Sequence, residues 1–437
     1  MSFVSHTEED RSRMLGAIGV KSVEDLFTDI PENLRLKDDL ALPAALSERE
    51  ADLLLKEAAA SNGLSASFLG AGAYRHYIPA AVDQLTIRSE FYTAYTPYQP
   101  EVSQGTLTAI FEFQTMLCRL TGMEVSNASM YDGATSLAEA VLMSVRSNNR
   151  GRVLMSESVN PHYRDVLKTY AWANGLNLKE FPSEGGCCRA EALECELDAD
   201  TSAVVVQSPN FFGCIEDLQK IAGVVHSGKA YLIVVVNEPL SLAMIKSPGE
   251  LGADIVCGEA GSLGNPVGFG GPMLGMLAAR GEFVRRMPGR LVGKTTDADG
   301  REAYVLTLQT REQHIRRERA TSNICTNQGL CALRSVIYLS LLGSGLSDLA
   351  RLNHRMAVHL RDRLLAKGFR RVHEGAFFNE FTLRYKGSRA LAEDLRKKGF
   401  LLGVDLGAHY RDYEDCLLIC TTEMNSPEEI NALIEAL

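Results

Sequence analysis

The sequence predicts an α/β protein with a large domain built on a mostly parallel sheet and a smaller C-terminal α+β domain. Short apolar runs of strand length alternate with stretches of helical pattern, which is typical of a parallel sheet covered on both faces. The strand candidates are residues 152–155, 203–207 and 231–236, and the helices between them cover 161–174 and 215–227. The last quarter of the chain differs, because a helical stripe there is followed by a single alternating strand.

The first 70 residues are charged and rich in helical pattern. Helices are expected over 8–15, 23–27 and 48–61, with Pro31 and Pro43 as breaks between them. At roughly 100–200 residues per domain, a chain of 437 residues holds several structural units. We therefore expect an N-terminal helical segment (1–70), a large domain (71–329) and a small domain (330–437).

The segment 68–100 shows neither helical nor alternating periodicity and combines glycines, tyrosines and prolines. We expect a long ordered loop, and such loops in compact domains are often functional. Helical spacing returns from Ile110 to Leu120 with Gly122 as the expected stop, and another helix is expected from Ala134. A run with seven glycines follows at 258–275.

The C-terminal part has three clear local signals. Apolar residues recur at helical spacing from Leu349 to Leu364, and 381–385 alternates as a strand. Ser426 to Glu429 forms a capping box with proline at the first helical position, which predicts the last helix. The charged run 311–319 is expected to be a solvated helix that joins the two domains, and 416–420 a short buried strand.

Composition excludes several classes of protein. There are 45 basic and 55 acidic side chains, a net charge of −10, which argues against a general nucleic-acid binder. The ten cysteines are scattered without a CxxC pair, so we expect neither a disulfide scaffold nor a zinc ribbon. No signal peptide or apolar run of about 20 residues is recognisable, and we expect a cytoplasmic protein without a membrane partner.

Several catalytic motifs are missing. The nine histidines form neither HExxH nor HxH, so no metal site is expected. Neither a GxSxG elbow nor a GxxxxGK[ST] loop is present, which argues against hydrolases and P-loop enzymes.

A large parallel-sheet domain followed by a small α+β domain suits a fold type I, pyridoxal-phosphate (PLP)-dependent transferase-like protein. Such an enzyme needs an anion cup at a helix N-terminus, a carboxylate for the pyridine nitrogen and a lysine for the Schiff base. Asp132, Gly133, Ala134, Thr135 and Ser136 open a helix and are the cup candidate, although Asp132 could equally be a simple helix cap.

The carboxylate candidate is Glu238, which follows the strand 231–236, where fold type I enzymes typically have aspartate. The lysine is expected within 258–265, and that run contains none. The nearest lysines are Lys246 and Lys294. The scaffold is therefore predicted without its nucleophile.

Several long stretches resemble the N-terminal (alpha) subunit of the two-subunit glycine decarboxylase, the P protein of the glycine cleavage system. The matching stretches are residues 70–85, 92–101, 103–107, 127–135, 258–271 and 311–328. The resemblance implies that a beta subunit carries the PLP-lysine, that this chain has lost it near Gly261, and that PLP is not covalently bound here. It implies an oxidoreductase that decarboxylates glycine and passes the aminomethyl group to the lipoyl arm of the H protein, as an αβ assembly paired into a heterotetramer.

Loss of CO2 needs a carboxylate held in a dry, oriented site. We therefore expect the tyrosine-rich loop to line the partner's active site or the lipoyl channel, or alternatively to be interface core. The lining candidates are Tyr95, Tyr98, Gln99, Glu101, Ser103, Gln104 and, more weakly, His76. Two other readings stay open: a stand-alone PLP enzyme that uses Lys246 or Lys294, and a non-catalytic scaffold that stabilises beta and docks the H protein.

Overall fold

The computed structural model describes residues 6–38, 40–63 and 66–437, which divide into two units, 1–63 and 64–437. The N-terminal unit contains α1 (Glu8–Ile18), η1 (Glu24–Phe27), η2 (Glu32–Leu34) and α2 (Glu48–Ala60). Two of the expected helices are confirmed, and each begins with a capping box, at Thr7 and at Ser47. The third, at 23–27, is a single 3₁₀ turn.

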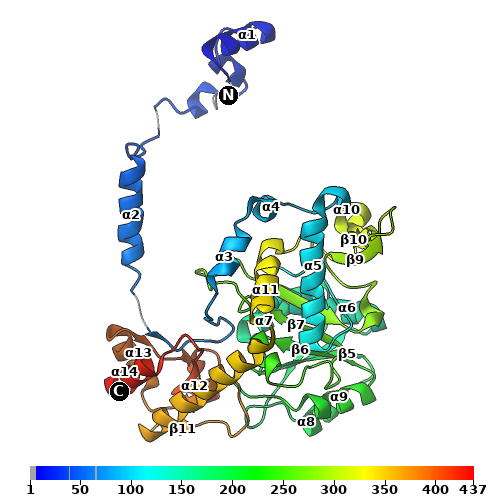
Figure 1. The fold of residues 1–437 in the computed structure, drawn as a ribbon, viewed down its shortest axis with the longest axis vertical. Helices are drawn as coiled ribbons and strands as arrows, with labels where there is room; N and C mark the ends of the chain where they lie inside the picture. Colours follow the sequence, from blue (N-terminus) through cyan, green and yellow to red (C-terminus); the bar gives the residue numbers. More distant parts are fainter. Residues whose placement is uncertain (1–5, 39, 64–65) are drawn as a thin grey trace. The chain divides into compact units, whose positions relative to one another are not determined.

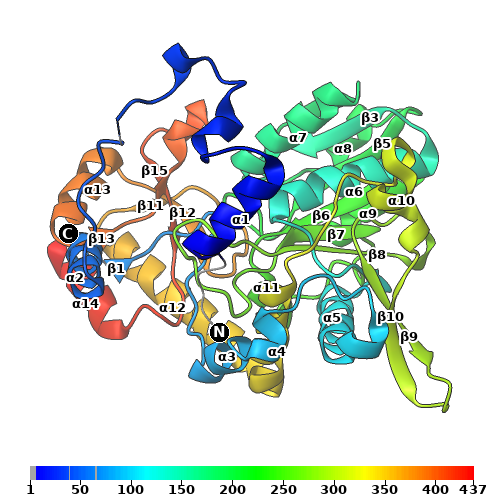
Figure 2. The same ribbon diagram turned by 90° about the horizontal axis from the view of Figure 1, so that it is seen from above.

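The second unit is built around a seven-stranded sheet in the order β2-β8-β7-β6-β5-β3-β4 (Figures 1 and 2). Its strands are β2 (Val125–Ser126), β3 (Arg152–Ser156), β4 (Asn177–Phe181), β5 (Thr201–Gln207), β6 (Tyr231–Val236), β7 (Ile255–Glu259) and β8 (Gly275–Ala279). The five strands from β4 to β7 pair in parallel, whereas β8 runs antiparallel to β7 and β2. This confirms the predicted mostly parallel sheet.

Each face of the sheet is covered by helices, because its strands are apolar on both sides. In β6, Leu232 and Val234 pack into one core and Ile233 and Val235 into the other. The first core also holds residues of α3 (Ala80–Thr86), α5 (Pro100–Thr121), α9 (Leu218–Ser227) and α11 (Gly329–Leu342). The second holds residues of α6 (Gly133–Asn148) and α7 (Pro161–Ala173). Helix α5 ends at Gly122, which adopts the left-handed conformation with φ +70°, as predicted.

Two predictions about connections are wrong. The expected loop 68–100 contains α3 and α4 (Ser89–Tyr92), which are too short for helical periodicity to show in the sequence. The expected joining helix at 311–319 is a series of single turns, η5 (Gln309–Arg311), α10 (Gln313–Arg316) and η6 (Arg317–Arg319), because Arg317 has a φ of +53°. These turns follow a hairpin that the sequence analysis missed, β9 (Leu291–Thr296) with β10 (Glu302–Thr307).

The small domain is a four-stranded antiparallel sheet in the order β11-β12-β15-β14, packed against helices. The strands are β11 (Arg370–Arg371), β12 (Glu380–Arg384), β14 (Val404–Asp405) and β15 (Cys416–Cys420). The helices are α12 (Leu346–Ala366), α13 (Ser388–Lys397) and α14 (Pro427–Ala436). The predicted strand at 416–420 is fully buried, and the predicted capping box opens α14.

Two elements near the expected domain borders at 70 and 330 pack with residues on the other side of the border. Strand β1 (Ala66–Ser67) pairs with β13 (Phe400–Leu401), and Phe68 is buried in the core of the small domain. Helix α11 lies beside α5 and contributes Tyr338 to the core of the large domain (Figure 1). The stretch Gly329–Ala366 is long and apolar enough to cross a membrane, but it consists of two helices joined by a turn, and the first is part of this core.

Candidate functional site

The C-terminal ends of β6 and β7 meet the N-terminus of α6, and polar side chains gather there. In open parallel sheets this edge is the usual place for a ligand. Glu238 follows β6, Glu259 is the last residue of β7, and Gly133 is the first residue of α6. All three are buried.

Two of the N–H groups at the start of α6 already donate hydrogen bonds to carboxylates of this chain. Asp132 accepts a hydrogen bond from the Thr135 N–H at 2.8 Å and completes a capping box with that residue. The N–H of Gly133 donates instead to the carboxylate of Glu259, at 3.1 Å. Asp132 and Thr135 therefore act as a helix cap, and Gly133 has an anionic partner from within the chain.

Glu259 collects backbone donors from three segments. Besides Gly133, it accepts hydrogen bonds from the N–H groups of Leu274 at 2.7 Å and Gly261 at 3.0 Å. Burial raises the pKa of Glu259, and the three N–H donors oppose that rise. Gly261, the expected position of the lost lysine, thus lies directly beside this carboxylate.

The space around Gly133 is filled. A Cβ atom at this position would lie 2.7 Å from Cζ of Tyr163 and 2.9 Å from the carbonyl carbon of Gly258. Tyr163 is a partly buried residue that packs with the core beneath α6. A residue larger than glycine does not fit at the start of this helix.

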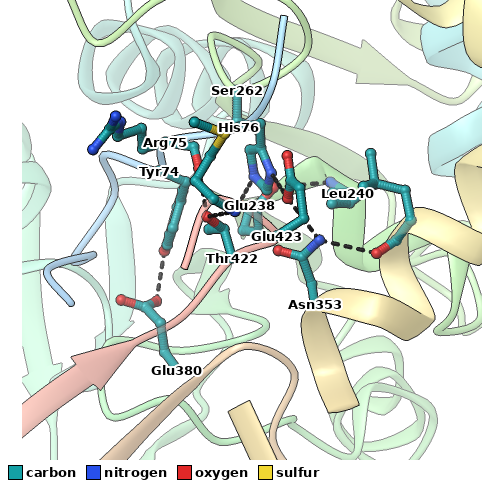
Figure 3. Close-up of polar contacts among 12 residues, drawn as sticks. Tyr74, Arg75, His76, Glu238, Leu240, Ser262, Asn353, Glu380, Thr422 and Glu423 are labelled. Atoms are coloured by element: carbon teal, nitrogen blue, oxygen red, sulfur yellow. Dashed lines mark hydrogen bonds and ion pairs between the residues drawn. The ribbon is translucent and has the colours of Figure 1, made fainter. Parts of the chain in front are cut away.

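A second network surrounds Glu238 (Figure 3). His76 lies between two carboxylates, with its Nε2 at 2.9 Å from Glu238 and its Nδ1 at 2.9 Å from Glu423. Burial acts to lower the pKa of His76, but the two glutamates outweigh it and raise the pKa to about 10. The ring is therefore an imidazolium at neutral pH. Ser262 donates its hydroxyl to the remaining oxygen of Glu238 at 3.1 Å, which connects this network to the end of β7.

A third buried glutamate, Glu380, lies in the same region of the structure. Its carboxylate accepts a hydrogen bond from the Tyr74 hydroxyl at 2.6 Å (Figure 3). It also accepts one from the Ala71 N–H, at 2.6 Å. Burial raises the pKa of Glu380 to about 7 in spite of these donors. The segment from 70 to 77 is thus held to the small domain by hydrogen bonds to Glu380 and Glu423.

These contacts decide whether the region could hold PLP. The helix N-terminus that would bind a phosphate is bound to Glu259, and the carboxylate that would face a pyridine nitrogen is bound to His76 and Ser262. Within the described ranges, no lysine forms a hydrogen bond or ion pair with either glutamate. Lys246 is exposed, and Lys294 forms an ion pair with Glu302 on the β9–β10 hairpin. The residues present do not fit the cofactor.

Some of the residues expected to line a partner's site are exposed, and the others make contacts within this chain. Tyr95 is 88% exposed, and Tyr98, Gln99 and Glu101 are also exposed. Tyr98 additionally lies 5.7 Å below the guanidinium of Arg290. These four side chains remain accessible to a partner.

The other three expected lining residues have roles within the chain. His76 is buried in the network around Glu238, so it does not face a partner. The amide of Gln104 bonds both the N–H and the carbonyl of Tyr304, each at 2.9 Å, and so fixes β10 to α5. Ser103 is half-buried with non-helical φ and ψ, and marks a kink near the start of α5.

A surface pocket lies between the tyrosine-rich segment and α11. Tyr92 and Tyr95 line it on one side, and Thr326 and Leu330 on the other. Arg290 also lines it, and its guanidinium is held by Thr326, Asn327 and the carbonyl of Cys325. Among the described residues, no group of three or more His, Cys, Asp or Glu side chains could hold a metal ion.

From the sequence, Asp132, Gly133, Glu238 and Gly261 are assigned to one expected cofactor site, but the role of Glu259 is missed. That residue stands inside the run 258–265, where the sequence predicts the loss of a lysine but gives no role to the glutamate. An unexplained acidic residue among glycines at a strand end was the available signal.

Comparison with known proteins gives a consistent result over the full chain. The family model described as "Glycine cleavage system P-protein" matches residues 1–437. The chain is 50% identical to "Probable glycine dehydrogenase (decarboxylating) subunit 1" of Moorella thermoacetica and 48% identical to the protein of that name from Anoxybacillus flavithermus. Each alignment covers 100% of this chain, and 99% and 98% of the relative.

Solved structures agree. A crystal structure titled as glycine decarboxylase (P-protein) of the glycine cleavage system, in inhibitor-bound form, has a TM-score of 0.90 at 44% identity. That match covers 100% of this chain and 99% of the other. A NifS-like protein, at 14% identity, has a TM-score of 0.64 over 85% of this chain and 98% of its own, which shows the shared fold. An aspartate aminotransferase double mutant of Thermus thermophilus, at 12% identity, has a TM-score of 0.55 over 91% and 96%.

Proposed function

Because the chain belongs to the glycine cleavage system P-protein family, we propose that it is the alpha subunit of a two-subunit glycine decarboxylase. With a PLP-bearing beta subunit it decarboxylates glycine and passes the aminomethyl group to the lipoyl arm of the H protein. The observation that carries this proposal is the full-length similarity to proteins named as subunit 1 of glycine dehydrogenase (decarboxylating).

The cofactor belongs to the second subunit in this proposal. PLP supplies an electron sink that accepts the electron pair of the carbon–carbon bond broken when CO2 leaves. In this chain the two positions that would recognise it are satisfied by Glu259 and by His76. These internal contacts support a division of labour in which the partner holds the cofactor.

The contribution of this chain is assigned to the exposed tyrosine-rich segment. Tyr95 and Tyr98 offer aromatic surface and phenol donors beside the pocket that Arg290 lines. Aromatic residues and arginine concentrate at protein interfaces, and a packed interface excludes water from a carboxylate that leaves as CO2. We assign these side chains, with Gln99 and Glu101, to the interface with the beta subunit near its site or the lipoyl channel.

The state of the cysteines supports a cytoplasmic location in this proposal. All ten cysteines are free, and two of them, Cys195 and Cys325, are exposed. Free exposed thiols suit a reducing compartment, which supports a cytoplasmic enzyme.

Co-expression with the second subunit tests the proposal. Exchange of labelled CO2 with the carboxyl group of glycine, measured with lipoylated H protein, is expected for the complex and absent for either chain alone. A stand-alone PLP enzyme would instead give a coloured chain by itself, and borohydride would trap the cofactor on Lys246 or Lys294. A pure scaffold would show unchanged single-turnover exchange after Tyr95→Phe and Tyr98→Phe in an intact complex.

A further inference from the structure

We propose that Glu259 is a built-in anion that fills the phosphate-binding position of this chain and thereby keeps phosphorylated cofactors out of it. This role of Glu259 is independent of which reaction the assembled enzyme performs.

The position itself is defined by the architecture. Helix α6 has 16 residues and begins where the parallel strands end. The free N–H groups and positive end of such a helix favour a phosphate at this place in α/β folds. The first N–H of α6, that of Gly133, points at an anion, but the anion is a side chain of β7.

Glu259 occupies this phosphate-binding position and accepts hydrogen bonds from segments outside the helix as well as from α6. Its two oxygens accept N–H groups from Gly133, Gly261 and Leu274, which come from α6, from the segment after β7 and from the segment before β8. These donors converge on one carboxylate that is 6% exposed. Three backbone donors from separate segments form an oxyanion nest, and here its ligand is covalently part of the chain.

The charge of Asp132 and the bulk of Tyr163 also oppose the binding of a phosphate at this position. Asp132 is adjacent to the nest and caps Thr135, so an incoming phosphate would meet two carboxylates. Tyr163 fills the volume beside Gly133. The pyridine side is closed as well, because Glu238 is bound by the imidazolium of His76.

The test is rescue of a Glu259→Ala variant by free anions. Thermal unfolding of the full-length chain is measured with increasing inorganic phosphate, or with acetate. Removing the carboxylate leaves the nest donors unpaired, and the melting temperature is expected to fall by roughly 3–6 °C. Phosphate and acetate should each restore at least half of that loss, and neither should stabilise the wild type to the same extent.

Glu216→Ala is the matched control. Glu216 is also buried and accepts hydrogen bonds from the N–H of Cys188 and the amide of Asn210. It directly precedes Asp217, the N-cap residue of α9, but none of its hydrogen-bond donors is an N–H group of a helix. Its variant should lose stability without anion rescue. Equal rescue of both variants, or none of Glu259→Ala, would overturn the proposal, and rescue by acetate alone would overturn the identification with a phosphate position.

Two further measurements apply if Glu259→Ala does not fold. Glu259→Gln keeps the side-chain size but removes the charge, and is expected to gain phosphate-dependent stability that the wild type lacks. Equilibrium dialysis of the wild-type chain against PLP, followed by borohydride reduction, should leave no retained cofactor. Retained, stoichiometric PLP on this chain would refute the exclusion.

Discussion

The charge of His76 is expected to make a large electrostatic contribution to the stability of this chain. We consider His76→Gln, which keeps a hydrogen-bonding side chain but removes the imidazolium between Glu238 and Glu423. The side chains of His76, Glu238 and Glu423 are 2%, 3% and 9% exposed, so water cannot replace the lost charge. Leaving buried charges without their partner typically costs about 3–5 kcal/mol of unfolding free energy.

The pH dependence follows from the shift of the His76 pKa from 6.5 to about 10. Because the pKa is raised in the folded state, the stabilisation is complete below pH 6.5 and is lost as the pH rises toward about 10. One proton bound by the folded chain and not by the unfolded chain corresponds to about 1.4 kcal/mol per pH unit in that window. The wild type should therefore lose stability from neutral to alkaline pH by this amount per unit.

Urea unfolding of wild type and variant, from neutral pH toward pH 10, measures both effects. The difference in unfolding free energy should be largest near neutral pH and shrink as the pH rises, because the wild type loses its proton. His359→Gln, at an exposed position of α12, is the matched control and should have no such effect. A constant difference between His76→Gln and wild type across this range, or one below about 1 kcal/mol at neutral pH, would refute the reasoning.

Three further predictions concern the segment 70–104. Tyr95→Ala should change the unfolding free energy by less than about 0.5 kcal/mol, because the side chain is 88% exposed, yet lower turnover of the assembled enzyme; normal turnover would remove Tyr95 from the shared site. Gln104→Ala should cost about 1–3 kcal/mol in urea unfolding and speed proteolysis of the β9–β10 hairpin, because two backbone groups of Tyr304 lose their partner; an unchanged cleavage rate would contradict this role. Tyr74→Phe should cost about 1.5–3 kcal/mol at neutral pH, and much less in a Glu380→Gln background, where an equal cost would exclude the coupling.

Elements with a strong local signal could be predicted from the sequence. The apolar runs of β3, β5 and β6, the glycine stop of α5 and the capping box of α14 each depend on a few adjacent residues. The β9–β10 hairpin lacked such a signal, because neither strand alternates between apolar and polar residues: β9 ends in the exposed residues 294–296, and the apolar residues of β10 are consecutive at 303–306. The apolar pattern of α11 identifies a buried face but not the core that buries it, and the structure shows that this face packs in the core of the large sheet.

The site was predictable where a residue follows a strand or starts a helix. Glu238 and Gly133 were found in that way, since topology alone brings strand ends and helix starts to one edge. The partners of these residues were not predictable, because Glu259 is 126 positions from Gly133 and His76 is 162 positions from Glu238. Such pairs are set by the tertiary fold.

The pairing of β1 with β13 has a consequence for synthesis. The beginning of the second unit is bonded to its end: Ala66 pairs with Phe400, and Ala71 donates to Glu380, 309 positions later. The parallel sheet can form while the ribosome is still translating. These first residues, in contrast, can form their native contacts only after almost the whole polypeptide has been synthesised. Closure of this long loop is therefore expected to be a late step in folding, and a nascent chain that stops short of α13 would leave Phe68 without its pocket.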